Sequence, residues 1–314
     1  IARSPDRPIA RSPDRPIARM ISRYTLSEES KKLTSISFQV ASSSSIREAS
    51  TVNVQDVSMY ARGVPAHGGI NSLRMGTTDR RLKCLTCGLS LEACPGHRGS
   101  IELPLPVYQA LFIDHTIKVL RSVCYFCSAI CITSEEKENA LQHPSEKAVF
   151  AAAYASARTR KRCLCCGGAR PNYTRSALGI RAEWEEALLE SEEERRVAND
   201  RFTPLHALTI LRGVDEEEAK RLFGKGFAPE DLVSCVISVP PPCTRPAISS
   251  ADCSRTRGQD DLTSRLQEIN KRCNELRVAM QRERDAKERE AKEDAIDDDP
   301  TDPADPADPT DPTG

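Results

Sequence analysis

The sequence is poor in aromatic residues, which make up 4% of its 314 positions. A large aromatic core, or a surface that stacks nucleobases, is therefore not expected. The sequence also lacks an apolar run as long as a membrane span and a recognisable secretory signal, so we expect no contact with a membrane. The formal net charge is −1, so the chain as a whole is not a polycation that would bind nucleic acid through bulk charge.

Signatures of a stand-alone enzyme are missing as well. The chain has no glycine-rich phosphate loop and no nucleophile elbow. Its histidines at positions 67, 115, 143 and 206 are isolated, without a partner motif. We therefore do not expect this chain to catalyse a reaction alone.

Both ends of the chain are dominated by proline and charge. Residues 1–34 open with a repeated arginine–proline unit, and residues 291–314 place proline at every third position from Pro300 to Pro312 among aspartates. Such segments cannot bury a core, so we predict that both are disordered. Because Met20 opens the ordinary sequence after Ile1, we also expect a fragment or a translation that starts upstream of the true start.

Cysteine is abundant, with 13 residues, and its spacing carries the strongest signal. Cys84, Cys87, Cys94 and His97 follow a C-x2-C-x6-C-x2-H pattern. Two such close pairs can aim four ligands at one zinc ion. The alternative, two reduced cysteine pairs in a small core, leaves His97 unexplained.

A second set of ligands is predicted downstream. It consists of Cys124, Cys127, Cys163 and Cys166, whereas Cys165 is expected to be a spectator. The 26 residues between His97 and Cys124 are too many for the interleaved sites of a RING domain, so we predict two sequential sites. The other cysteines show no paired spacing: Cys131, Cys235, Cys243, Cys253 and Cys273. Without a secretory signal, these thiols indicate a reducing compartment and metal ligation.

The remaining pattern predicts an α+β fold with short strands, connecting helices and a long C-terminal helix. Strands are expected within 35–60, at 101–103 and at 233–239, and helices at 107–120, from 134, at 148–157, 181–199, 204–211 and 215–224, and at 260–290. In the last helix, apolar residues from Leu262 to Met280 form one seam, which we expect to pack on the domain. A coiled-coil dimer is the weaker alternative.

Two stretches of the sequence resemble one family. They are Met75–Tyr108, followed by the pair Cys124 and Cys127, and Ser238–Ile248, followed by Arg257–Ile269. Together they resemble the N-terminal clamp region of the largest subunit of eukaryotic DNA-directed RNA polymerases. The Met-Gly-Thr lead-in and the Pro-Pro-Cys-Thr-Arg-Pro box favour polymerase III, with the polymerase of a large DNA virus as an alternative.

The resemblance implies a role for each segment. Residues 35–248 would be the clamp, whose two ligand sets hold two structural Zn²⁺ ions, and residues 249–259 would be the lid. Arg245, Arg255 and Arg257 would contact the phosphates of nucleic acid, since guanidinium groups pair with phosphate oxygens whatever the base sequence. The implied partners are other polymerase subunits, template DNA and the RNA–DNA hybrid, and the implied location is the nucleus.

The family's catalytic Mg²⁺ loop, Asn-Ala-Asp-Phe-Asp-Gly-Asp, does not occur in these residues. Nucleotidyl transfer needs such a carboxylate cluster, so Mg²⁺ is expected only in the complete enzyme, and this chain alone should be inactive. The alternative function is an independent zinc-binding module that binds nucleic acid or a protein. Its basic patch would be Arg158–Arg162 and its partner helix the seam from Leu262 to Met280.

Overall fold

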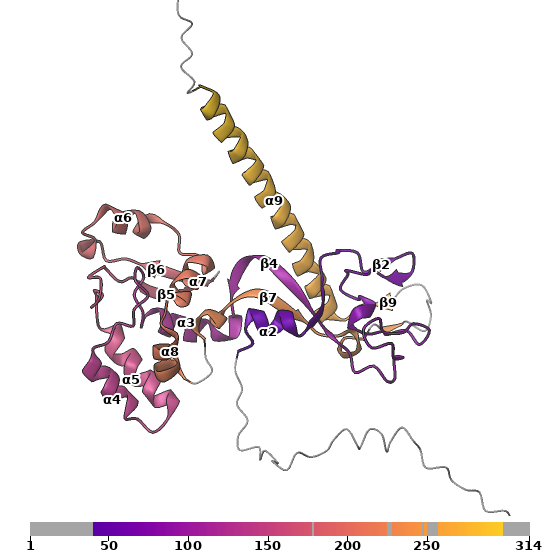
Figure 1. Ribbon diagram of the computed structural model, residues 1–314, viewed down its shortest axis with the longest axis horizontal. Coiled ribbons are helices and arrows are strands. Elements are labelled where there is room, and N and C mark those ends of the chain that lie inside the picture. Colours follow the sequence, from indigo (N-terminus) through magenta and orange to yellow (C-terminus); the bar gives the residue numbers. More distant parts are fainter. Residues whose placement is uncertain (1–39, 178, 225–227, 247, 250–256, 298–314) are drawn as a thin grey trace, which may run out of the picture. The chain divides into compact units, whose positions relative to one another are not determined.

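The computed structural model describes residues 40–297, except 178, 225–227, 247 and 250–256 (Figure 1). The mixture of helices and small sheets agrees with the α+β prediction. The arginine–proline repeat predicted to be disordered at 1–34, and the aspartate–proline segment from 298, lie outside the described residues.

A three-stranded sheet has the order β1 (Ser50–Asn53), β4 (Arg98–Tyr108) and β7 (Val233–Val239). β1 runs parallel to β4, and β7 runs antiparallel to it. The β4–β7 register is interrupted between Glu102 and Val107. Pro104 and Pro106 lie in this interval and have no N–H to donate to a ladder, which accounts for the irregularity.

β4 corrects two predictions. The strand expected at 101–103 is part of a longer one, and residues 107 and 108, expected to open a helix, still belong to this strand. The helix begins only at α3 (Ile113–Leu120), after the short 3-10 turn η2 (Ala110–Phe112). Pro106, directly before the expected start of the helix, is compatible with a helix start, but proline is tolerated in an irregular strand as well.

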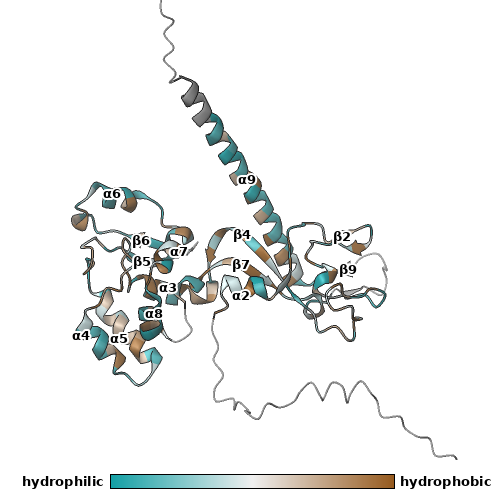
Figure 2. Ribbon diagram, in the orientation of Figure 1, coloured by the Kyte–Doolittle hydropathy of each residue, from teal (hydrophilic) through white to brown (hydrophobic). Residues whose placement is uncertain are grey.

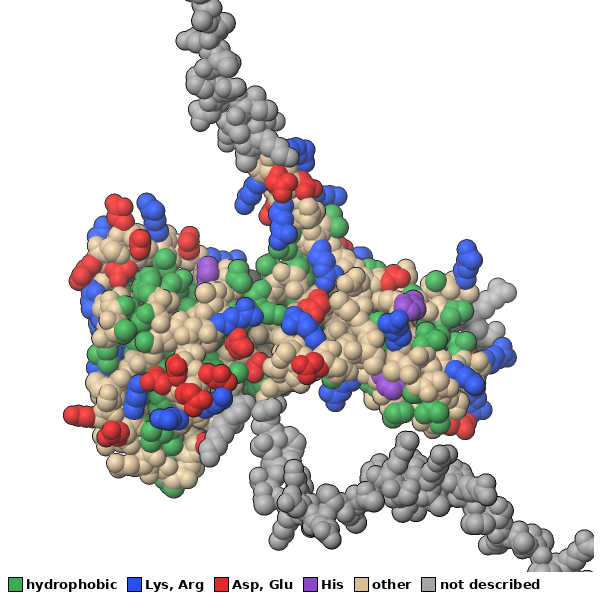
Figure 3. Space-filling view, viewed as in Figure 1, with side chains coloured by type: hydrophobic (Ala, Val, Ile, Leu, Met, Phe, Trp, Pro, Cys, Tyr) green, Lys and Arg blue, Asp and Glu red, His purple; other side chains and the backbone are tan. Residues whose placement is uncertain are grey.

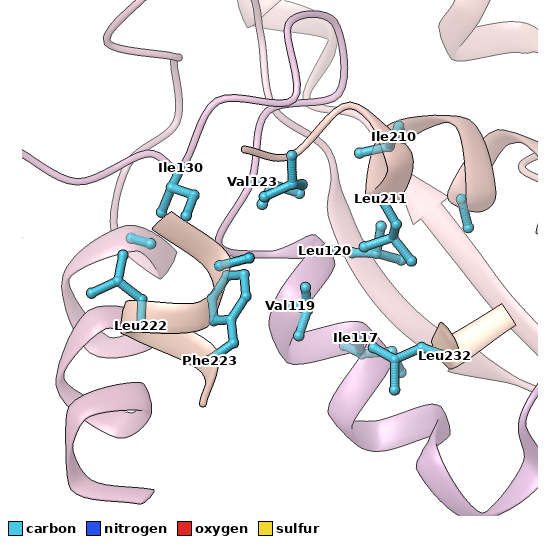
Figure 4. Close-up of a cluster of buried hydrophobic side chains, with 14 of the residues drawn as sticks. Ile117, Val119, Leu120, Val123, Ile130, Ile210, Leu211, Leu222, Phe223 and Leu232 are labelled. Carbon is cyan, nitrogen blue, oxygen red and sulfur yellow. The ribbon is translucent and has the colours of Figure 1, made fainter. Parts of the chain in front are cut away.

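A large hydrophobic cluster is built on α3. Around it pack α4 (Ser134–Leu141), α5 (Glu146–Arg158), α7 (Pro204–Arg212), α8 (Glu216–Phe223) and the hairpin of β5 (Asn172–Ser176) and β6 (Gly179–Glu183). Leu120 points toward Leu211, and Ile117 lies beside Leu232 (Figure 4). These side chains are almost entirely buried, so the cluster holds these helices and the hairpin together.

The helix predicted at 181–199 is wrong. Its first part is β6, followed by η3 (Glu186–Leu188), and only α6 (Glu192–Asn199) is helical. Pairing with β5 overrides the helical propensity of the first residues, and a capping box between Ser191 and Glu194 starts the helix later. In contrast, α7 and α8 begin as predicted, with caps at Thr203 and Asp215.

The long helix α9 (Asp261–Asp297) extends beyond the predicted end at residue 290. It is largely hydrophilic (Figure 2), with Lys, Arg, Asp and Glu side chains interspersed along it (Figure 3). At its base Leu266 and Cys273 join a second hydrophobic cluster, which also contains Val52, Val54, Ile70, Met75, Ile101 and Val239.

The predicted seam of α9 is only partly buried. Leu262 is 46% exposed and Leu276 38%. The buried face instead includes Thr263 and Asn270, and the side-chain amide of Asn270 donates to the carbonyl of Asp56 at 2.9 Å. Apolar periodicity could not reveal the whole of this face, because two of its four buried residues in the described part of α9, Thr263 and Asn270, are polar.

Short elements complete the described chain. They are α2 (Ser43–Glu48), β2 (Tyr60–Ala61), β3 (Val64–Pro65), η1 (Leu73–Met75), η4 (Pro229–Leu232), η5 (Pro242–Thr244), β8 (Ile248–Ser249) and β9 (Arg257–Gly258). β8 and β9 pair with each other and close the base of the segment predicted to be the lid, whose residues 250–256 lie outside the described residues.

Candidate metal centres

The first predicted ligand set comes together in space. The ligand atoms of Cys84, Cys87, Cys94 and His97 all lie within 4.8 Å of one another. The Sγ atoms of Cys87 and Cys94 are 3.5 Å apart, and Cys94 Sγ lies 3.7 Å from Nε2 of His97. A tetrahedron with Zn–S bonds of about 2.3 Å has S···S edges of about 3.8 Å, so the set has dimensions that fit a metal ion.

The second set is assembled in the same way. The sulfurs of Cys124, Cys127, Cys163 and Cys166 also lie within 4.8 Å of one another. The S···S distance is 3.6 Å both for Cys124 with Cys166 and for Cys127 with Cys163. These distances far exceed the ~2.05 Å of a disulfide bond, and the four thiols are free.

A shared backbone turn positions three of the four ligand pairs. The first cysteine of each pair donates its N–H to the carbonyl five residues later: Cys84 to Leu89 at 3.0 Å, Cys124 to Ala129 at 2.9 Å and Cys163 to Gly168 at 2.9 Å. The turn places its two sulfurs on the same side. Each turn therefore forms from local sequence, and the long segment between Cys127 and Cys163 does not disturb the turn that begins at Cys163.

Each turn requires a left-handed residue after its second cysteine. Gly88 and Gly167 occupy this position with φ of 71° and 72°, whereas Ser128 occupies it with φ of 55°. Glycine adopts this conformation without strain, and serine does not. Ser128 is also buried, and a Cβ placed on Gly213 would lie 2.6 Å from its Oγ.

Burial and hydrogen bonds shift the pKa values of the thiols in the two groups. Burial favours the neutral thiol of Cys163, but the N–H groups of Cys166 and Cys165, together with the thiols of Cys127 and Cys124, outweigh it and lower its pKa to about 6. In the first group, burial raises the pKa of Cys94 to about 11. A cation bound beside Cys94 would supply the positive charge that favours its thiolate near neutral pH.

Two further cysteines lie close to the second group. Cys165 is exposed and lies outside the set of four, and its N–H donates to the sulfur of Cys163 at 3.3 Å. Cys131 is buried against Cys124 and Cys163. The spacing of the sequence does not indicate this, because backbone pairing after the turn brings Cys131 in: Ile130 forms a β-bridge with Val123, and the N–H of Cys131 donates to the carbonyl of Ser122 at 2.9 Å.

Close packing ties the first group to a distant segment. Gly96, with φ of 82°, lies so close to Pro241 and Cys243 that an added Cβ would be 2.8 Å from Pro241 Cβ and 2.7 Å from Cys243 Sγ. The N–H of His97 donates to the carbonyl of Met75 at 2.9 Å. The Pro-Pro-Cys-Thr-Arg-Pro box therefore forms part of the wall of the first group.

A buried carboxylate binds the backbone of the segment that follows Cys166 in the second group. Glu194 is buried and accepts the N–H groups of Ala169 at 3.0 Å, Glu190 at 2.8 Å and Ser191 at 3.2 Å. The bond to Ala169, foremost among these contacts, holds the pKa of Glu194 below its usual range. The sequence does not single this residue out, because it lies in a run of glutamates, a composition typical of the solvated face of a helix.

The basic run beside the second group is mostly neutralised. Arg160 pairs with Glu136 at 2.8 Å, Lys161 with Glu185 at 2.8 Å and Arg162 with Glu190 at 2.6 Å. Three of the basic residues of this run are therefore paired with carboxylates, so the run is not an open patch of positive charge.

Arg245 points into the protein. It is 3% exposed, and its guanidinium donates to the carbonyls of Pro240 and Ile70, to Oδ1 of Asn71 and to Oγ1 of Thr263. The expected phosphate contact by Arg245 does not fit this conformation, because its donors are already bonded within the protein.

The other two predicted contacts to nucleic acid remain predictions. Arg255 lies outside the described residues, and Arg257 is known only as a backbone position in β9. Among the residues that are described, no helix is both long and apolar enough to cross a bilayer.

Fold and site together define a class: an α+β domain with two four-residue groups that could each hold a metal ion. The model of the family "RNA polymerase Rpb1, domain 1" matches residues 30–296, and the chain belongs to this family. One curated relative is the "DNA-directed RNA polymerase II subunit RPB1" of Euplotoides octocarinatus, which is 32% identical over 265 residues. That match covers 79% of this chain and 54% of the relative, so the chain spans about half of the relative's length.

Proposed function

We propose that this chain is the N-terminal clamp part of the largest subunit of a DNA-directed RNA polymerase, braced by two structural zinc ions. The observation that carries this proposal is the assembly of two complete ligand groups within the stretch matched by the family model. Metal binding would stabilise the fold around each group, as in other small metal-dependent domains.

The donor sets favour zinc in a structural role. One group offers three sulfurs and one imidazole nitrogen, and the other offers four sulfurs. Thiolate and imidazole are the ligands that Zn²⁺ prefers, and four protein ligands leave no open position for substrate. The metals would therefore hold the domain together rather than take part in a reaction.

Synthesis of RNA from nucleoside triphosphates would belong to the complete enzyme. The Mg²⁺-binding aspartate loop of the family is not in these residues, so we expect no polymerase activity from the chain by itself. Other polymerase subunits, template DNA and the RNA–DNA hybrid would be its partners, and the nucleus its location. Within the lid segment, Arg255 and Arg257 would meet nucleic-acid phosphates; the sequence motifs favour polymerase III.

Metal analysis tests the zinc proposal. The purified chain should contain about two zinc ions, and Cys127→Ser should reduce this to about one. Cys165→Ser is the matched control, because Cys165 is an exposed cysteine of the same turns that lies outside the ligand set; it should retain both ions. Equal zinc content in the two variants would contradict the proposed ligands.

A pull-down tests the membership of a polymerase. The tagged chain should co-purify with other polymerase subunits from cells, and the Cys127→Ser variant should do so less well. Zinc binding without any subunit association would instead favour an independent module. An independent module that binds nucleic acid predicts tight, salt-sensitive binding by the chain alone. The ion pairs of Arg160, Lys161 and Arg162 weigh against this alternative, because they reduce the positive charge of its proposed basic patch.

A further inference from the structure

A pocket of about 420 Å³ lies where the ends of α3 and α5 meet the start of β5. It is rich in positive charge. Its cationic lining residues are Arg121, Arg158, Arg160, Lys161 and Arg170, and its carboxylates are Glu183 and Glu185. Leu188, Pro171 and Asn172 complete the wall.

Three of these arginines have no acidic partner among the described residues. Lys161 pairs with Glu185, and Arg160 with Glu136 outside the pocket. By contrast, Arg121 donates to the carbonyl of Tyr173 at 3.0 Å, and Arg170 to the carbonyl of Ala157 at 2.8 Å. Neutral carbonyl groups satisfy donors but do not cancel charge, so the positive potential of Arg121 and Arg170 remains.

Arg158 is an accessible cation of this pocket. Arg158 is exposed, and its guanidinium carbon lies 6.0 Å from the ring centroid of Tyr154. Its side chain makes no hydrogen bond or ion pair with the described residues. The donors of Arg158 can therefore bind an anion in the pocket, and the charges of Arg121 and Arg170 would stabilise it there.

We propose that this pocket binds a phosphate-type oxyanion, with Arg158 as the accessible donor and Arg121 and Arg170 supplying fixed positive charge. Guanidinium groups match the geometry of phosphate oxygens, often through two parallel bonds. The pocket has the size of a small-ligand site. The proposal goes beyond the function proposed above, because the described residues of this chain alone form the pocket.

Titration calorimetry of the purified full chain with inorganic phosphate in a chloride buffer tests the proposal. The unmodified chain should give saturable binding at one site. Arg158→Gln should weaken it about tenfold, the loss expected for one charge-assisted hydrogen bond. Glu185→Gln should strengthen it, because Lys161 loses its partner and turns to the anion.

Arg181→Gln is the matched control. Arg181 is an exposed arginine of β6, has no ion pair among the described residues, and lines a different pocket. Its variant changes the net charge by the same amount and should bind phosphate as the unmodified chain does. Equal weakening by Arg158→Gln and Arg181→Gln would reduce the effect to net charge and overturn the proposal, as would the absence of saturable binding.

The source of the oxyanion is distinguished by competition. If a short single-stranded oligonucleotide displaces phosphate from the unmodified chain but less well from Arg158→Gln, the site accepts a phosphodiester backbone. If phosphate binds and the oligonucleotide does not displace it, the site takes free phosphate or a small phosphorylated molecule. Both results support the pocket, and neither depends on zinc stoichiometry or on association with polymerase subunits, so failure here leaves the proposed function untouched.

Discussion

Arg245→Met should strongly destabilise the chain without removing a contact to nucleic acid. The guanidinium joins the segment of Ile70 and Asn71 to Pro240 and, through Thr263, to the first turn of α9. Methionine has a similar length but no donors, so the substitution leaves these acceptors unpaired in the interior.

The magnitude follows from the contacts. Each of the hydrogen bonds contributes roughly 1 kcal/mol net, and buried carbonyls left dry add to the loss, so we expect about 3–5 kcal/mol in total. Burial of the positive charge acts in the opposite direction, since it lowers the pKa of Arg245 to about 10. Thr263→Val removes one acceptor and should cost about 1 kcal/mol.

Urea unfolding at fixed zinc concentration measures these losses. Arg245→Met and Thr263→Val should be coupled in a double-mutant cycle, with the double variant losing less than the sum by at least about 0.5 kcal/mol. Arg265→Met, an exposed arginine of the same helix that pairs with Glu268, is the control and should cost less than about 1 kcal/mol. Equal losses for Arg245→Met and Arg265→Met would refute the buried role of Arg245.

Two further perturbations probe the metal groups. Gly96→Ala should destabilise the first group by about 2 kcal/mol or more beyond the ~1 kcal/mol cost of a left-handed alanine. The control is Gly63→Ala, which has the same φ of 82° but where an added Cβ would meet no neighbouring atom within 4 Å; it should show only the smaller loss in thermal unfolding. Equal losses for the two variants would exclude the predicted clash with Pro241. Glu194→Gln should cost about 1–2 kcal/mol near neutral pH. The fold lowers the pKa of Glu194, so the stabilisation that its carboxylate provides is present above the ordinary carboxyl pKa of 4.5 and is lost as the pH falls through the lower pKa of the folded chain. A pKa of Glu194 above 4.5 in an NMR titration of the folded chain would contradict this reasoning.

The sequence predicted those features that depend on neighbours along the chain. The cysteine pairs are local turns, and α7 and α8 carry their caps within three residues of their starts. Their geometry needs no distant partner, which explains why spacing and capping residues were sufficient to locate them.

The features that it could not predict depend on distant partners. Arg245 bonds to Asn71, 174 positions away, and nothing in a Pro-Pro-Cys-Thr-Arg-Pro box reveals that its arginine is buried. The run beginning at residue 181 has the composition of a helix, but hydrogen bonding to the strand at 172–176 makes its first residues extended. The apolar seam of α9 was identified, whereas its buried Thr263 and Asn270 depend on polar groups supplied by Asp56 and Arg245.

The strained serine of the second group also bears on how the family can vary. Because the hydroxymethyl group of Ser128 fills the space that a Cβ on Gly213 would need, the two positions are epistatic. A lineage could gain alanine at 213 only after position 128 had become glycine, a first step that also relieves the left-handed strain. The order of these substitutions is therefore constrained, because the reverse order would pass through an intermediate in which the two side chains clash.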